Sequence, residues 1–154
     1  MTSKASIGGH PVHPMLVAFP IGLWITSFAA DLVFYFHRDW PNLLVISKFM
    51  IAAGCLGAIA AAIPGIIDWL SITNREVKRI ADWHARLNII ALIVFAISLY
   101  FRMRAGAHWV NYNLRIPFLL SFLGVVLISI SGWLGGELTF KHGVGAAAKQ
   151  DLPE

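Results

Sequence analysis

The sequence contains few charged residues for its length. Only 13% of its 154 residues are Asp, Glu, Lys or Arg, whereas 58% are hydrophobic. Soluble domains usually carry about 25% charged residues, so this scarcity argues against a water-soluble domain and predicts an integral membrane protein. The net charge of +4 comes from basic residues at the ends of apolar runs. That placement suits contact with anionic lipid headgroups and not with nucleic acid.

Cysteine is almost absent as well. The single Cys55 lies within an apolar run, so neither a disulfide nor a thiolate metal site can form within one chain. Low-complexity segments and long linkers are also missing, and we expect one domain over residues 1–154. The length leaves no room for the extra spans or internal repeats of most transporters. No nucleophile stands beside a base. We therefore expect an electron-transfer or accessory membrane subunit, free to form homo- or hetero-oligomers, more than a stand-alone enzyme.

Four apolar runs are long enough to cross a bilayer, which takes about 20 residues. They cover residues 14–36, 43–70, 80–101 and 114–136. Tryptophans gather near the ends of these runs, where interfacial aromatic residues are expected. The predicted fold is all-α, an up-down bundle of four membrane-spanning helices. Pro14 is expected to open the first helix with His13 at its N-cap, because a proline at the first helical position costs little.

An even number of spans places both ends of the chain on one side of the membrane. That side carries more basic residues than the other: Lys4, Arg75, Lys78, Arg79, Arg86, Lys141 and Lys149. The opposite side carries Arg38, Lys48, Arg102, Arg104 and Arg115. The positive-inside rule therefore predicts cytoplasmic termini.

Histidines converge on the side of the termini. Two stand before the first span in the segment GHPVHPM, one begins the third span and one follows the fourth. These are His10, His13, His84 and His142. The other two, His37 and His108, are expected in connections at the opposite end. A polar site at the termini side is therefore predicted, unless the four histidines serve only as helix-end residues.

Three acidic residues fall on the same side as these histidines, namely Asp68, Asp82 and Glu137. A divalent transition metal such as zinc or iron takes three or four imidazole and carboxylate ligands. The four histidines and three acidic residues together offer enough ligands for such an ion. We also expect Asp82 to pair with Arg86 four positions later, and Asp31 to pair with Lys48 at the opposite end.

A b-type haem is the leading interpretation of this site, and a bare metal ion is the alternative. In an up-down bundle the first and third helices are parallel and lie diagonally opposite, roughly 14 Å apart if neighbours are about 8–10 Å apart. His13 and His84 begin these two helices and would bind the iron from opposite faces. Its propionates would meet basic residues at the same end: Arg79, Arg86 and Lys141.

The second run contains small residues at every fourth position, in the segment AAGCLGAIAAAIPG. Small residues at this spacing let neighbouring helices approach closely in lipid. The alternative is that a face without side chains makes room for a flat cofactor.

Three segments resemble the bacterial membrane family called domain of unknown function 2231. They are GHPVHPMLVAFPIGL at the start, DWHARLN at the third span and GWLGGELTFKHGVG at the end of the fourth. The resemblance implies a fold similar to four-helix b-type cytochromes and a place in the bacterial inner (cytoplasmic) membrane. Because some members are joined to Rieske iron–sulfur domains, it also implies nearby electron transfer. With Cys55 alone, that redox partner would be a separate chain, and a quinone is the other partner expected. The residues carried over are His10, His13, His84, Glu137 and His142.

Overall fold

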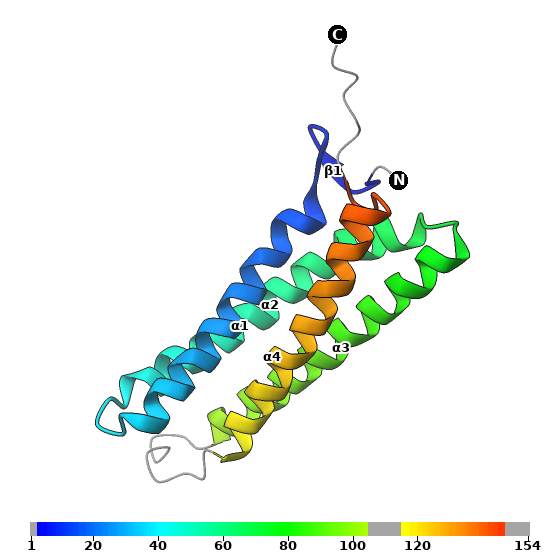
Figure 1. The fold of residues 1–154 in the computed structure, drawn as a ribbon. Coiled ribbons are helices and arrows are strands. Elements are labelled where there is room, and N and C mark those ends of the chain that lie inside the picture. The colour runs from blue at the N-terminus through cyan, green and yellow to red at the C-terminus, as the bar shows by residue number, and fades with distance from the viewer. Residues whose placement is uncertain (1–2, 105–114, 147–154) are drawn as a thin grey trace.

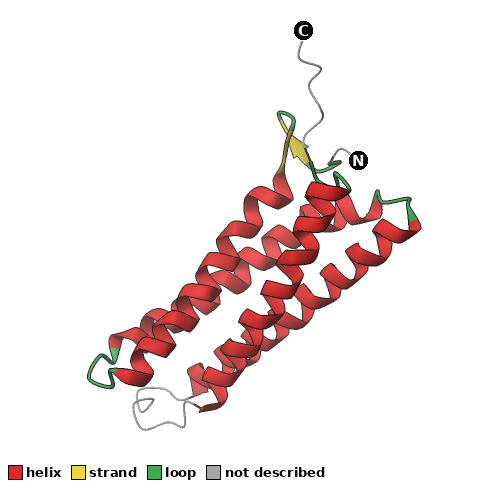
Figure 2. Cartoon of the chain, in the orientation of Figure 1, coloured by secondary structure: helices red, strands yellow, loops and turns green. Residues whose placement is uncertain are grey.

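The structure is a computed structural model that describes residues 3–104 and 115–146. In these residues four long helices form the bundle. Figure 1 shows how they run, and helices dominate the cartoon of Figure 2. They are α1 (Val12–Phe36), α2 (Asn42–Leu70), α3 (Arg75–Arg104) and α4 (Arg115–Gly136). All four are long and apolar enough to cross a membrane, with α4 counted through Lys141. The predicted all-α bundle of four spans is confirmed.

Two helix starts differ from the prediction. Helix α1 begins at Val12 after an extended Pro11, so His13 lies inside the first turn and is not the N-cap residue. Helix α3 begins at Arg75, earlier than residue 80, because the Asn74 side chain accepts hydrogen bonds from the Glu76 and Val77 amides. Such a cap satisfies amides that have no partner within the helix. The predicted start of the fourth span at residue 114, and His108, fall outside the described residues.

Short elements close the end of the bundle that carries the described chain ends. Strands β1 (Ser6–Ile7) and β2 (His10–Pro11) form a hairpin before α1. Its turn residues Gly8 and Gly9 both have positive φ, as the tightest hairpin turns require. A π-helical turn, η2 (Glu137–Lys141), continues α4. The Ser3 amide donates to the Ala146 carbonyl at 3.3 Å, so the described chain ends lie side by side.

The bundle consists of two helical hairpins. Helices α1 and α2 pack closely along their length, as do α3 and α4, whereas contacts between the two hairpins are sparser. Helices α1 and α3 lie diagonally opposite, as the up-down order predicted.

The two hairpins are structural counterparts of each other. Four residues of α1 correspond to residues of α3 that lie 71 positions later in the chain. This is the separation of Asp31 from Arg102. The pairs are His13 with His84, Trp24 with Phe95, Ser27 with Ser98 and Asp31 with Arg102. Gly54, Ala61 and Gly65 of α2 likewise match Gly124, Ser131 and Gly135 of α4 at a second constant offset. An approximate two-fold axis therefore runs along the bundle.

This internal repeat corrects the expectation that the chain is too short to contain one. The repeated unit is a single hairpin, and its helices share few residue identities at matched positions. What repeats is the contact that a side chain of the first helix of each hairpin makes with the second helix. Trp24 of α1 lies against Gly54 of α2, and Phe95 of α3 lies against Gly124 of α4. The Trp24 and Phe95 rings then stack on each other in the core, with centroids 4.4 Å apart.

Candidate functional site

Two histidines meet at the end of the bundle that carries the chain ends. His13 comes from the first turn of α1 and His84 from α3. Their ring centroids are 6.3 Å apart and their ring planes are nearly perpendicular, at 88°. Each hairpin contributes one ring, so the approximate two-fold axis passes between them.

Both rings are held by the same type of hydrogen bond. His13 Nδ1 lies 2.8 Å from the Ala61 carbonyl oxygen on α2, and His84 Nδ1 lies 2.8 Å from the Ser131 carbonyl oxygen on α4. A carbonyl oxygen only accepts, so the proton resides on Nδ1 in each ring. In the neutral form of each ring, Nε2 is then the nitrogen with the lone pair.

A glycine lies under each ring. A Cβ atom at Gly65 would be 2.8 Å from His13 Nδ1, and one at Gly135 would be 3.0 Å from His84 Cε1. Each glycine follows the accepting carbonyl by one helical turn, Gly65 after Ala61 and Gly135 after Ser131. The glycines therefore give both rings the room to reach the backbone carbonyls.

Two further side chains surround His84. Asn88 donates through Nδ2 to His84 Nε2 at 3.1 Å and to the His84 carbonyl at 3.0 Å. The Ser131 hydroxyl lies 3.1 Å from His84 Nδ1 and donates to the His84 carbonyl at 3.2 Å. His84 and Asn88 thus form a polar stripe on α3, and the Asn88 amide keeps its bond to the His84 carbonyl if Nε2 binds another group.

The other histidines predicted at this end are not brought to the pair. His10 lies in β2 and is exposed, while His142 caps the end of η2 and is half-buried. Over the described ranges, 3–104 and 115–146, no three His, Cys, Asp or Glu side chains are grouped so that they could hold a metal ion. The seven-residue metal site expected from the sequence is therefore not assembled here.

The three acidic side chains predicted as metal ligands have other partners. Asp68 accepts from the Ser3 hydroxyl at 2.9 Å and from the Lys4 and Ala5 amides at 2.8 and 3.2 Å, which fastens the N-terminal segment. Asp82 accepts from Trp69 Nε1 at 2.7 Å. Glu137 pairs with Lys141 at 3.2 Å. Because these partners lie in different directions, the carboxylates do not converge on the imidazoles.

The basic residues expected near a cofactor also lie elsewhere. Arg79 and Arg86 are seven positions apart and exposed, so they share one face of α3, roughly opposite the face of His84. Arg86 lies over the Trp83 ring at 5.5 Å from its centroid, in place of the expected pairing with Asp82. Lys141 is engaged by Glu137.

The small residues of α2 receive side chains from α1. Trp24 packs on Gly54, Phe19 on Gly57 and His13 on Gly65. Close approach of the two helices therefore accounts for the small residues of α2. This was the first of the two interpretations. The space that the alternative reserved for a flat cofactor is filled by rings of α1, because these rings stand above the glycines.

At the opposite end, Asp31 pairs with Arg102 and not with Lys48. Both oxygens of Asp31 accept from the guanidinium, at 2.9 and 2.5 Å. Ser98 and Ser121 accept further hydrogen bonds from Arg102 at 3.3 and 3.1 Å. Asp31 and Arg102 occupy matched positions of the two hairpins, so the pair lies close to the axis and is buried there.

Sequence reasoning missed the residues that position the histidines. These are Ala61, Gly65, Ser131 and Gly135. A signal was present, since Gly54 and Gly65 are repeated as Gly124 and Gly135 at one offset. An alignment of the second and fourth runs with each other would have revealed it.

The fold and its polar end define the class of this protein: a multi-pass membrane protein built as a four-helix bundle from two matched hairpins. The chain belongs to the family described as "Predicted membrane protein (DUF2231)", whose profile matches residues 9–148. No curated protein and no solved structure matches the chain significantly.

Proposed function

We propose that this protein is a membrane electron-transfer module that binds a b-type haem through His13 and His84. The observation that carries the proposal is the imidazole pair. One ring comes from each hairpin, and each is fixed through Nδ1 to a backbone carbonyl. Histidines that bind a metal through one nitrogen almost always donate a hydrogen bond from the other.

The spacing of the rings fits this role. An imidazole nitrogen binds a transition metal at about 2 Å, so two rings on opposite sides of one ion have centres about 6 Å apart. The centroids of His13 and His84 are 6.3 Å apart. The spacing of the two centroids is therefore compatible with both rings binding one iron.

The number of protein ligands favours haem over a bare ion. A zinc or iron ion without a cofactor needs three or four protein ligands, whereas a haem brings its own four equatorial nitrogens and needs only two. In the part of the chain that the structure describes, two imidazoles meet and no third His, Cys, Asp or Glu joins them.

When bound, haem supplies reversible one-electron transfer. The residues of this chain hold and orient it. Gly65 and Gly135 admit the rings, Ala61 and Ser131 fix them, and Asn88 releases Nε2 while keeping its backbone bond. His13 lies in the first turn of α1, close to the end of the bundle, where a quinone or a separate redox protein can approach.

The test is an absorption spectrum of the detergent-purified protein, first oxidised and then reduced with dithionite, with metal analysis of the same sample. We expect a Soret band and, on reduction, sharp α and β bands of a six-coordinate low-spin haem. Replacing His13 or His84 with alanine should remove these bands. His37→Ala is the matched control, because His37 stacks on Trp40 at the other end of the bundle.

Two other results would each point to a different function. A colourless sample that contains stoichiometric zinc or iron would favour an ion site, and His10→Ala and His142→Ala would then show whether those residues take part. A colourless, metal-free sample would reduce the imidazoles to hydrogen-bonding groups between helices, as in a cofactor-free accessory subunit.

A further inference from the structure

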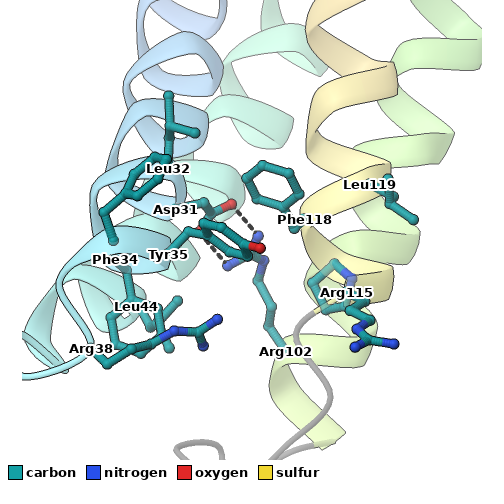
Figure 3. A pocket seen from close by; sticks show the side chains of 12 residues that line it. Asp31, Leu32, Phe34, Tyr35, Arg38, Leu44, Arg102, Arg115, Phe118 and Leu119 are labelled. Atoms are coloured by element: carbon teal, nitrogen blue, oxygen red, sulfur yellow. Dashed lines mark hydrogen bonds and ion pairs between the residues drawn. The ribbon is translucent and has the colours of Figure 1, made fainter.

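A cavity lies at the far end of the bundle from the histidine pair. Its volume is about 610 Å³, which falls within the range of small-molecule sites. It is lined mainly by α1 and α4, and Figure 3 shows Arg102 of α3 reaching Asp31 across it. The cavity therefore lies on one of the two sides where the hairpins meet.

The cavity carries more positive than negative charge. Arg38, Arg102 and Arg115 line it, together with a single carboxylate from Asp31. Asp31 neutralises Arg102 through a buried two-oxygen ion pair. Among the residues that line the cavity, three guanidinium groups therefore stand against one carboxylate, which is a formal excess of positive charge.

The two arginines also lie at the depth of the headgroups. Arg38 follows the end of α1, and Arg115 is the first residue of α4. The Arg38 guanidinium lies over the Phe34 and Tyr35 rings, 5.1 and 5.3 Å from their centroids. Arginine at a helix end places its charge in the interfacial layer while its stem covers apolar surface.

Away from these arginines the lining becomes apolar. The Tyr35 and Phe118 rings, from α1 and α4, stack with centroids 6.0 Å apart. Leu32 and Leu119 extend the lining toward the outside of the bundle, where 41% and 60% of their surfaces are exposed. One end of the cavity is thus cationic at headgroup depth, and the other continues onto the lipid-facing surface.

We propose that this cavity binds an anionic phospholipid. Its phosphate lies against Arg38 and Arg115, and an acyl chain runs past Phe118 along Leu32 and Leu119. Basic pockets between membrane helices are typical sites for anionic headgroups. A neutral quinone ring fits less well, because the attraction of two guanidinium charges acts fully only on a charged group. The proposal does not depend on haem at the other end.

Native mass spectrometry of the whole protein can test this. The protein is exchanged into detergent containing equal amounts of phosphatidylglycerol and phosphatidylcholine with identical acyl chains. We expect preferential retention of phosphatidylglycerol. Arg38→Gln and Arg115→Gln should each lower that retention about fivefold, in line with the contribution of one basic residue near an anionic lipid. Arg104→Gln should leave it unchanged, because Arg104 lies at the same end but does not line the cavity.

Lysine variants separate loss of charge from loss of fold. Arg38→Lys and Arg115→Lys keep the charge and should retain most of the lipid. Equal retention of the two lipids, or an effect of Arg104→Gln as large as that of Arg38→Gln, would overturn the proposal. So would displacement of the lipid by an equal concentration of glycerol phosphate, since the apolar wall would then contribute nothing. Preferential retention of a quinone over phosphatidylglycerol would assign the cavity to a neutral ligand instead.

Discussion

At the scale of single residues, the histidine pair depends on what lies beneath each ring. An imidazole reaches a backbone carbonyl of the neighbouring helix only where that helix has no side chain in the way. Gly65 and Gly135 fulfil this condition at matched positions. The two glycines therefore control the placement of the rings as directly as the hydrogen bonds do.

We expect Gly65→Ala and Gly135→Ala to destabilise the protein by about 1–3 kcal/mol, because the added methyl group overlaps a ring that is already fixed. Gly22→Ala and Gly132→Ala are the matched controls, since a Cβ at either position meets nothing within 4 Å. Replacing glycine in an unobstructed helix should stabilise by about 0.4–1 kcal/mol. Thermal unfolding followed by tryptophan fluorescence measures the stability of all four variants. A higher Tm for Gly65→Ala would show that the His13 ring is not held where the structure has it.

At the scale of elements, the two hairpins meet through few but specific contacts. The Trp24–Phe95 stack lies in the middle, and the Asp31–Arg102 pair lies toward the end opposite the histidines. Both join matched positions, so each contact lies near the axis that relates α1 to α3. A charge pair on this axis has to be asymmetric, because two copies of either residue would repel each other.

Removing one member of the pair should cost more than exchanging the two residues. Asp31→Asn or Arg102→Leu leaves an uncompensated polar group inside the bundle, and we expect a loss of about 3–5 kcal/mol. The exchange Asp31→Arg with Arg102→Asp restores opposite charges at equivalent positions. It should recover part of the loss, but not all, because Ser98 and Ser121 accept from Arg102 in its present place.

The Tm values of the single variants and the exchanged pair in one detergent decide this. An exchanged pair no more stable than Arg102→Leu would mean that the two positions are not equivalent. The matched positions of Asp31 and Arg102 in the two hairpins would then have no structural meaning.

At the scale of the whole molecule, four spans bring the chain ends together. The Ser3 amide donates to the Ala146 carbonyl, and Asp68 at the end of α2 fastens the N-terminal segment beside them. The histidine pair therefore lies at the end of the bundle that carries the chain ends. The side of the membrane on which that end lies sets the compartment that the histidine pair faces.

Fusion of a reporter that fluoresces only in the cytoplasm should give signal at both ends of the chain. The physical reason is the excess of basic residues at the end that contains Arg75 and Arg79. The same reporter inserted between α3 and α4 should stay dark. Signal from the inserted reporter alone would reverse the orientation, and signal at only one chain end would contradict the four-span topology.

The sequence by itself determined the spans, their order and the end of the bundle to which each polar residue belongs. These properties follow from local hydropathy and length, since about 20 apolar residues form a spanning helix whatever they pack against. For that reason His13 and His84 were correctly placed at one end, on diagonally opposite helices. Their fixation through Nδ1 could not be foreseen in the same way.

Only the tertiary structure decided which residues at that end meet. Contact depends on the rotation of each helix about its own axis, and packing between helices sets that rotation. His10, in the hairpin before α1, and His142, after η2, lie at the same end of the bundle but are not grouped with the pair. Asp68 binds the N-terminal segment instead. Asp31 forms its ion pair with Arg102 and not with Lys48, because the two hairpins repeat one packing pattern around a common axis. That repeat is carried by glycines and by contact geometry, which a search for apolar runs does not detect.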